Sequence, residues 1–309
     1  MNKTVSRPIF AVSGPTCSGK TALGVRLALH VGGEVVNFDS VQIYRGIEIA
    51  TAKPALEEMK GVPHHLIGYV EPSIDYTAAD WAGDAAETIR DIEARGRTAV
   101  LVGGTGFYLR TLRRPLFESP KTDRRLRDRL RELRLKRGSE HLHRMLIRVD
   151  PAAAETIQVR DHARTMRALE HFFQTGIRIS DVWSERPEPP DLDERIRLFV
   201  LRPDRNELYE KINARTAAHF SAGLVDEVKH LLAKGVNEYG NALGAHAYRR
   251  VCEYLRGERT LESALERSQQ DVRNYAKRQL TWFRKEEEAI WLDGFGDEET
   301  VWQQLIERL

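Results

Sequence analysis

Residues 14–21 read Gly14-Pro15-Thr16-Cys17-Ser18-Gly19-Lys20-Thr21, which fits the P-loop pattern of a glycine, four residues, and then Gly-Lys-Ser/Thr. Residues 8–12 form a short apolar run that predicts a strand, and residues 21–31 show the apolar spacing of a helix. Glycines let backbone N–H groups converge on an anionic oxygen, and the helix N-terminus adds the positive end of its dipole. The sequence therefore predicts a phosphate-binding loop between a strand and a helix.

Three side chains of this loop carry separate predictions. Lys20 supplies a positive charge to the phosphate, and the hydroxyl of Thr21 can ligate Mg²⁺. No histidine or aspartate neighbours Cys17 in the sequence to activate its thiol, so a small filler residue is a better interpretation than a nucleophile. The loop pattern leaves open which compound carries the bound phosphates.

Strand and helix patterns alternate on both sides of this loop. Residues 34–38, 98–102 and 196–201 predict three further strands, and residues 80–95 predict an amphipathic helix. Strand, helix and strand at this spacing imply a parallel sheet with helices on both faces. The predicted fold class is therefore α/β, with a P-loop-type parallel sheet core flanked by helices and an inserted all-helical domain.

The predicted domain boundaries follow a change of pattern near residue 116. Residues 1–115 and 187–309 are assigned to the catalytic core, whose later part is mostly helical. Residues 116–186 are assigned to a basic helical insertion domain. The run Arg186-Pro187-Glu188-Pro189-Pro190 breaks the chain at the end of this insertion.

Composition excludes several classes of protein. The 309 residues include 48 lysines and arginines against 46 aspartates and glutamates, so no whole-molecule charge argues for a polyanionic partner. Residues 113–186 nevertheless hold 18 basic and 11 acidic residues. Two cysteines rule out a disulfide-rich secreted scaffold, and we find neither a long apolar run nor a signal peptide. We therefore expect a cytoplasmic protein with a basic block.

Polar residues follow the second and third predicted strands. Asp39-Ser40-Val41-Gln42 begins just after residues 34–38, and a carboxylate at this end of a strand lies in the ligand crevice of such a sheet. Asp39 could hold Mg²⁺ through water, act as a general base, or cap the next segment. Gly103-Gly104-Thr105-Gly106 follows residues 98–102 in place of the acidic residue usual in an ATPase, which weakens a hydrolase interpretation.

Two predicted helices of the basic block have the composition of an RNA-binding surface. The helix over residues 123–137 carries cations on nearly all sides. The helix over residues 161–173, with the residue before it, places three arginines on one face: Arg160, Arg164 and Arg167. An RNA backbone or an extruded base is a natural partner for them. The alternative is a solvated surface whose arginines pair with Asp161 and Glu170.

Two other patterns are less specific. Residues 273–284 mix cations with aromatic residues, which fits either a nucleotide-stacking surface or an ordinary amphipathic helix. The histidines at 64–65 and 141–143 lack companion cysteines or clustered carboxylates at metal-binding spacing. We therefore predict no zinc site.

Together these motifs resemble those of one family, the tRNA dimethylallyltransferases (tRNA isopentenyltransferases, or IPP transferases). The matching pieces follow the order of the family along nearly the whole chain: residues 14–21, 37–44, 51–54, 61–66, 102–106, 164–170, 175–176 and 275–279. The sequence departs from the family pattern at Arg160, Ala163, Val272 and residues 244–248. These departures bear on the fine tRNA contacts rather than on the transfer chemistry.

The resemblance implies transfer of a dimethylallyl group from dimethylallyl diphosphate to N6 of the adenosine 3′-adjacent to the anticodon, with release of diphosphate. It implies Mg²⁺ as cofactor, tRNA as partner, no membrane, and a monomer. Asp39 matches the general base, Thr105 and Arg215 match its catalytic helpers, and Gly14–Thr21 matches the donor-diphosphate cradle. The implied tRNA contacts are Asp39, Ser40, Val41, Gln42, Thr105, Arg127, Ala163, Arg164, Thr165, Met166 and Arg167.

Three other functions remain as alternatives. A P-loop kinase of a small molecule would explain the loop and Asp39, but it leaves the basic block without a role. A non-catalytic RNA-binding module would explain the basic block alone. An enzyme that prenylates free adenine nucleotides would share the chemistry, and the long basic insertion argues for tRNA instead.

Overall fold

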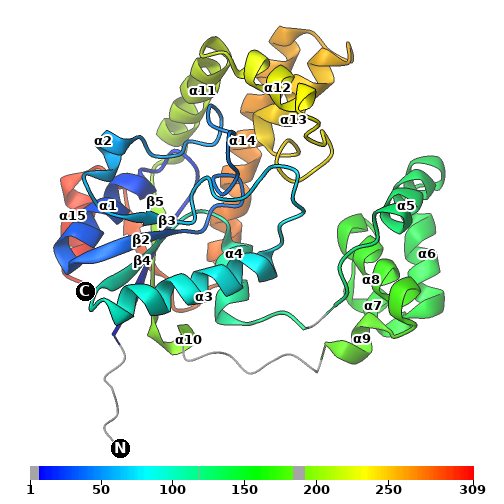
Figure 1. The fold of residues 1–309 in the computed structure, drawn as a ribbon, viewed down its shortest axis with the longest axis horizontal. Coiled ribbons are helices and arrows are strands. Elements are labelled where there is room, and N and C mark those ends of the chain that lie inside the picture. Colours follow the sequence, from blue (N-terminus) through cyan, green and yellow to red (C-terminus); the bar gives the residue numbers. More distant parts are fainter. Residues whose placement is uncertain (1–6, 118, 184–191) are drawn as a thin grey trace, which may run out of the picture. The chain divides into compact units, whose positions relative to one another are not determined.

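The structure, a computed structural model, describes residues 7–117, 119–183 and 192–309 (Figure 1). The chain forms two compact units: the sheet unit, residues 1–113 and 190–309, and the helical unit, residues 114–189. The chain-breaking run predicted at residues 186–190 lies outside the described residues. No helix in the described ranges combines the length and the apolar composition that a bilayer span requires.

The sheet unit is built on six parallel strands in the order β3-β2-β4-β1-β5-β6. The strands are β1 (Ile9–Ser13), β2 (Gly33–Asn37), β3 (His64–His65), β4 (Thr98–Val102), β5 (Ile196–Arg202) and β6 (Ile290–Asp293). Ala11 in β1 lies opposite Leu101 in β4 on one side and Leu198 in β5 on the other. The predicted α/β class with a parallel sheet is confirmed.

Helices pack on both faces of this sheet. In the described part of the sheet unit they are α1 (Lys20–Val31), α2 (Leu56–Met59), α3 (Ala78–Ala94), α4 (Gly106–Arg113), α10 (Leu192–Arg195), α11 (Arg205–Ser221), α12 (Leu224–Ala233), α13 (His246–Leu255), α14 (Leu261–Phe283) and α15 (Glu299–Ile306). Trp81 and Ile89 of α3 belong to the core on one face. Leu27 of α1 and Leu305 of α15 belong to the core on the other, and Figure 1 shows these two helices together.

Strand β5 shows why both cores form. Leu198 and Val200 belong to the core that contains α3, whereas Phe199 and Leu201 belong to the core that contains α1 and α15. Successive side chains of a strand point to opposite faces of the sheet, so a continuous apolar run buries both faces. The strand predicted at residues 196–201 is confirmed, and it contributes to both cores.

The helical unit has its own apolar core. Its described helices are α5 (Arg124–Arg137), α6 (Ser139–Val149), α7 (Pro151–Thr156), α8 (His162–Thr175) and α9 (Ile179–Val182). Leu142, Leu146 and Leu169 are fully buried in this core. Aspartates begin three of the helices, at Asp123, Asp150 and Asp161, where each carboxylate accepts backbone N–H bonds that the first turn leaves unpaired.

The two outermost strands, β3 and β6, were not predicted. The β3 strand has only two residues, and Nε2 of the second, His65, lies 2.7 Å from the buried carboxylate of Glu34. Arg95 Nη2 lies at the same distance from Glu34. No group of three or more histidines, cysteines or carboxylates able to hold a metal occurs among the described residues.

The contact between α1 and β4 makes a test of the fold. A Cβ added to Gly24 of α1 would lie 2.3 Å from Cγ2 of Val102. We expect Gly24→Ala to lower the free energy of unfolding by about 1–3 kcal/mol through overpacking, although alanine is the better helix former. The substitution Val102→Ala should restore part of this loss, as measured by urea denaturation.

Gly83 in α3 is the matched control. It is exposed, and an added Cβ would meet nothing within 4 Å. Gly83→Ala should therefore raise the free energy of unfolding by roughly 0.5–1 kcal/mol. Equal effects of the two glycine substitutions would contradict the close approach of α1 to β4.

Candidate active site

Three loops meet at one edge of the sheet. Strands β2, β4 and β1 are neighbours and parallel, so their carboxyl ends lie side by side. The P-loop follows β1, Asp39 follows β2, and Thr105 follows β4. The structure thus brings the predicted phosphate loop and the predicted carboxylate to the same edge, where ligands bind in sheets of this type.

Thr105 joins the loops that follow β2 and β4. Its hydroxyl oxygen accepts a hydrogen bond from the backbone N–H of Ser40 at 3.0 Å and lies 3.3 Å from Ser40 Oγ. The backbone N–H of Thr105 donates to the carbonyl oxygen of Phe38 at 3.3 Å. Asp39 is therefore flanked on both sides by residues that are fixed to the Thr105 loop.

Asp39 uses one carboxylate oxygen as a cap. Its Oδ1 accepts the backbone N–H groups of Val41 at 2.9 Å and Gln42 at 3.3 Å. No described residue donates a hydrogen bond to Oδ2, and the residue is half-buried. Asp39 therefore caps the next segment with Oδ1 alone, and Oδ2 remains available for another partner. The side chain of Gln42 points elsewhere, because its amide donates to the carbonyl oxygens of Thr51 and Ala52.

The P-loop has the backbone of an anion cradle. Gly19 has φ +82°, and a Cβ there would lie 2.8 Å from the backbone nitrogen of Gly296. Lys20 Nζ donates to the carbonyl oxygen of Pro15 at 2.8 Å. Desolvation lowers the pKa of Lys20 to about 8, and the charge of Asp39 acts in the opposite direction. A lysine at the start of a helix in these surroundings gains from an anionic ligand.

Two small side chains of the loop differ in their availability. The Ser18 hydroxyl is fully buried and has no hydrogen-bond partner among the described residues, so it can bind a ligand oxygen. The Cys17 thiol packs beside a small apolar cluster that includes Phe295. Burial raises the pKa of Cys17, against the opposing charges of Arg215 and Lys20. A thiol with a raised pKa holds little thiolate at neutral pH, which agrees with the filler interpretation.

Arg215 reaches the loop from α11. Its guanidinium donates to the hydroxyl of Thr16, so a cation far along the chain stands beside the cradle. Burial and then the charge of Arg215 lower the pKa of His219 to about 4, so this histidine is neutral at pH 7. Arg215 is thus positioned to meet a phosphate, beside the loop for which the family resemblance implies a helper role for it.

Helix α14 supplies two residues to which the sequence interpretation assigned no role. The side chain of Gln279 accepts the backbone N–H of Thr16 at 2.9 Å and donates to the carbonyl oxygen of Gly104 at 2.9 Å. Burial, followed by the charge of Asp39, raises the pKa of Tyr275, and a hydrogen bond with Thr105 opposes this. The motif at residues 275–279 was visible in the sequence, but nothing in it indicated contacts with two distant loops.

The predicted nucleotide-stacking surface at residues 273–284 divides between two environments. Phe283 and Gln279 are buried, whereas Lys277 and Arg278 are exposed. Trp282 is half-buried and meets the ring of Phe107 edge to face, with ring centres 6.3 Å apart. The buried side of α14 is therefore that of an ordinary amphipathic helix. Its exposed side carries the cations of the predicted stacking surface.

The predicted tRNA contacts of the helical unit are also divided. Ala163 and Arg164 are exposed on α8. The next two side chains point inward: Thr165 is 1% exposed and Met166 is 7% exposed. Thr165 Oγ1 donates to the carbonyl oxygen of Asp161, and Met166 belongs to the core. Their side chains support α8, so any contact they make with a ligand would involve the backbone.

Most of the expected arginine surface is paired. Glu170 is fully buried and receives two hydrogen bonds from Arg127, at 2.7 and 2.8 Å. Arg167 Nη1 lies 3.8 Å from the same carboxylate, and its Nη2 donates to Ser119 Oγ at 2.6 Å. Arg164 lies 3.3 Å from Asp161. The alternative of paired arginines is therefore correct for two of the three face residues, and Arg160 alone of these three has no ion-pair partner among the described residues.

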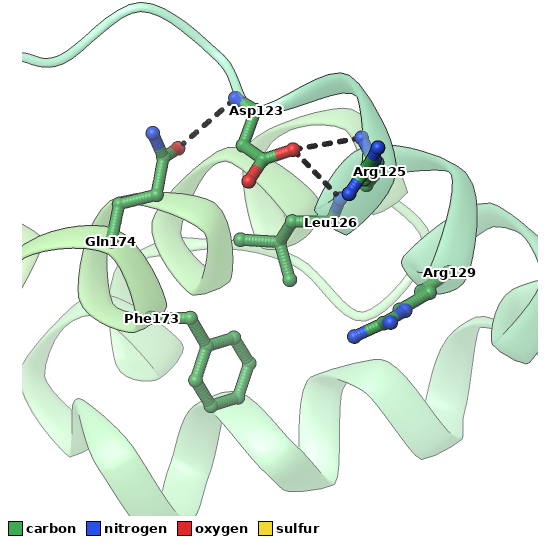
Figure 2. Close-up of a pocket in the computed structure, with 6 residues that line it drawn as sticks. All are labelled: Asp123, Arg125, Leu126, Arg129, Phe173 and Gln174. Atoms are coloured by element: carbon green, nitrogen blue, oxygen red, sulfur yellow. Dashed lines mark hydrogen bonds between the residues drawn. The ribbon is translucent and has the colours of Figure 1, made fainter.

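An open hollow lies between the start of α5 and the end of α8. It has a volume of roughly 550 Å³ and is lined by Asp123, Arg125, Leu126, Arg129, Phe173 and Gln174 (Figure 2). Phe173 is 47% exposed, and Figure 2 shows the Arg129 side chain reaching toward its ring. Among the described residues, neither the Arg125 nor the Arg129 side chain has a hydrogen-bond or ion-pair partner. The hollow therefore combines an exposed aromatic face with unpaired positive charge.

Family models match nearly all of the chain. The model described as IPP transferase matches residues 42–286, and that described as isopentenyl transferase matches residues 7–71. The tRNA dimethylallyltransferase of Koribacter versatilis is 44% identical over 293 residues, which cover 95% of each chain. The tRNA dimethylallyltransferase of Solibacter usitatus is 42% identical over 302 residues, which cover 98% of each chain.

Solved structures give the same answer. A full-length tRNA isopentenylpyrophosphate transferase from Bacillus halodurans superposes with a TM-score of 0.70 at 33% identity, over 98% of this chain and 99% of the other. A eukaryotic dimethylallyltransferase described as acting on tRNA superposes with a TM-score of 0.78 at 26% identity, over 98% of this chain and 77% of the other. The likeness thus extends through both units of the chain.

Proposed function

The chain belongs to the IPP transferase family, and we propose that it transfers a dimethylallyl group from dimethylallyl diphosphate to N6 of the adenosine 3′-adjacent to the anticodon of certain tRNAs, releasing diphosphate. The observation that carries this proposal is the placement of an anion-binding loop and a carboxylate with one free oxygen at the same sheet edge. The first can receive the leaving group, and the second can receive a proton.

The donor half of the reaction belongs to the P-loop. As the bond between the allylic carbon and oxygen breaks, negative charge grows on the diphosphate. Lys20, Arg215 and the buried Ser18 hydroxyl stand around the loop and can share that charge. Lys20 leaves the carbonyl oxygen of Pro15 to do so, and this carbonyl keeps the hydrogen bond from the backbone N–H of Ser18 at 3.3 Å. An allylic donor with a stabilised leaving group needs no covalent intermediate, which fits the inert Cys17.

The acceptor half of the reaction belongs to Asp39. Its unbonded Oδ2 can take the proton that the exocyclic adenine amine loses as the new N–C bond forms. The capped Oδ1 keeps the carboxylate in one orientation during this transfer. The target base is stacked in the anticodon loop, so it must be turned out of the stack, at a cost of a few kcal/mol. Thr105, bonded to Ser40, holds the backbone beside Asp39 in place.

Mg²⁺ fits the donor chemistry of this site. Thr21 offers a half-exposed hydroxyl at the first turn of α1, and the described residues offer no cluster of three acidic or histidine ligands. Mg²⁺ commonly binds through one or two protein ligands together with substrate phosphates and water. Thr21 would therefore hold it jointly with the diphosphate. When bound, the ion supplies neutralisation of negative charge on the leaving group.

The helical unit supplies the tRNA contact in this proposal. The hollow of Figure 2 fits one unpaired nucleotide, because an exposed aromatic ring can stack on a base and free arginines can hold its phosphate. Arg160, just before α8, and the exposed Arg164 on α8 add positive charge. One chain contains the loop, the carboxylate and this surface, so a monomer is the simplest acting form.

The direct test is mass analysis of tRNA nucleosides after incubation with the protein, dimethylallyl diphosphate and Mg²⁺. We expect one dimethylallyl adenosine in the anticodon loop, and its absence from every tRNA would contradict the proposal. Parallel reactions with AMP as acceptor, and with ATP and small phosphate acceptors, separate the two enzyme alternatives. Prenyl AMP without modified tRNA would favour the free-nucleotide enzyme.

Asp39→Asn tests the general base. Asparagine keeps a side-chain oxygen that can accept the N–H groups of Val41 and Gln42, so the loop should keep its shape. It cannot take a proton, so we expect kcat to fall by about 10²–10⁴-fold. Filter binding should show an unchanged Kd for tRNA. Retained catalysis would exclude Asp39 as the base, whereas loss of the wild-type activity with retained binding also excludes the non-catalytic alternative.

Phe173→Ala and the double variant Arg125→Gln/Arg129→Gln test the hollow. Loss of one stacked base should weaken tRNA binding by about 1–3 kcal/mol. Each lost phosphate contact should reduce the slope of log K against log salt by about one. Lys229→Gln is the control for loss of a positive charge elsewhere, since Lys229 is exposed on α12 and already paired with Asp226 at 3.1 Å. A salt slope equal to that of the control would show that the hollow does not bind tRNA.

A further inference from the structure

We infer that Gln279 is a positioning residue that connects the P-loop to the loop after β4 and so fixes their separation. This inference rests on the proposed function. Its carboxamide is 4% exposed and bridges two backbone groups from different loops. Oε1 accepts the N–H of Thr16 in the P-loop, and Nε2 donates to the carbonyl oxygen of Gly104, each at 2.9 Å. Both polar ends of the buried amide are therefore satisfied, and each by a different side of the site.

The shape of the loop after β4 depends on this amide. A Cβ at Gly104 would lie 2.1 Å from Nε2 of Gln279, so any side chain there would displace the bridge. Gly104 does not have a positive φ, and its glycine is therefore explained by close approach rather than by backbone conformation. The Gln279 bridge therefore requires glycine at position 104.

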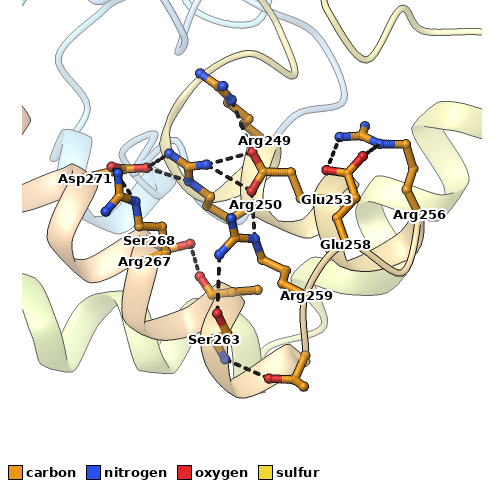
Figure 3. A network of polar contacts seen from close by, with 12 residues as sticks. Arg249, Arg250, Glu253, Arg256, Glu258, Arg259, Ser263, Arg267, Ser268 and Asp271 are labelled. Carbon is orange, nitrogen blue, oxygen red and sulfur yellow. Dashed lines mark hydrogen bonds and ion pairs between the residues drawn. The ribbon is translucent and has the colours of Figure 1, made fainter.

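The helix that carries Gln279 is firmly held. Ala276 and Phe283 on either side of it are 0% and 1% exposed. Earlier in α14, the carboxylate of Asp271 accepts a hydrogen bond from Arg250 of α13 at 2.6 Å. Arg250 also donates to Glu253 (Figure 3). Arg249 and Arg259 add further ion pairs to Glu253, at 3.4 and 2.7 Å. Gln279 can fix the two loops only if α14 itself is rigid, and these contacts hold α14 in place.

Thr16 is held from two directions as a result. Gln279 binds its backbone N–H, and Arg215 binds its hydroxyl. On the other side, Gly104 precedes Thr105, which is bonded to the backbone of Ser40 beside Asp39. The bridge therefore sets the separation between the phosphate loop and the base. Transfer requires the allylic carbon to lie about 3–3.5 Å from the amine nitrogen, and an error near 1 Å can cost about 10²-fold in rate.

The test is steady-state kinetics of Gln279→Leu, which keeps the volume of the side chain and removes both hydrogen bonds. We expect kcat to fall at least about tenfold, with the Kd for tRNA changed by less than about twofold. Gln269→Leu is the matched control on the same helix, because Gln269 donates a single bond to the carbonyl oxygen of Asn213 away from the loops. It should leave kcat unchanged.

Two further variants keep the inference testable if Gln279→Leu folds poorly. Gln279→Glu keeps an acceptor for Thr16 and places a carboxylate oxygen against the Gly104 carbonyl, so kcat should also fall. Gly104→Ala should displace the same amide. Its effect on kcat should not add to that of Gln279→Leu, because both remove one bridge.

The outcomes separate the two levels of the proposal. A folded Gln279→Leu protein with normal kcat would overturn the positioning role and leave the proposed function intact. Additive effects of Gln279→Leu and Gly104→Ala on kcat would do the same. If the wild-type protein forms no prenylated tRNA, the function fails, and calorimetric binding of inorganic diphosphate then decides the role of Gln279. The role stands if Gln279→Leu binds diphosphate more weakly than both the wild type and Gln269→Leu, and it falls if the three proteins bind alike.

Discussion

The parallel pairing of β2, β4 and β1 is the constraint on which the site depends. Parallel strands end at the same edge, so three loops with different chemistry meet without any one of them being long. The first brings a phosphate cradle, the second Asp39, and the third a run of glycines that allows close contacts. Antiparallel pairing of any one strand would move its loop to the opposite edge and dissolve the arrangement.

Charge around the cradle is arranged for a ligand that arrives and leaves as an anion. Lys20 and Arg215 face the loop, and in the free protein each is bonded to a neutral oxygen, of Pro15 and Thr16. Bonds to neutral oxygens are exchanged for an anion more readily than ion pairs are. The lowered pKa of Lys20 shows that desolvation disfavours its charge until an anion compensates it. Asp39 provides only part of that compensation.

Local patterns predicted much of the fold and of the site. The P-loop, the four longer strands, Asp39 and the helical insertion each follow from residues that neighbour one another in sequence. The strands β3 and β6 were missed because they are short and lie at the sheet edges. Gln279 was missed as well, because its partners are Thr16 and Gly104, and no local period records a contact across that distance.

The basic block shows most clearly what composition omits. Counting charges treats all 18 of its cations alike, but the fold buries Glu170 beneath Arg127 and Arg167. Those arginines are required to keep a buried carboxylate paired, since an unpaired one costs several kcal/mol. The cations that remain for a polyanion are those with no carboxylate beneath them, Arg125 and Arg129 among them. Whether an arginine can contribute to an RNA-binding surface therefore depends on whether a carboxylate already pairs with it.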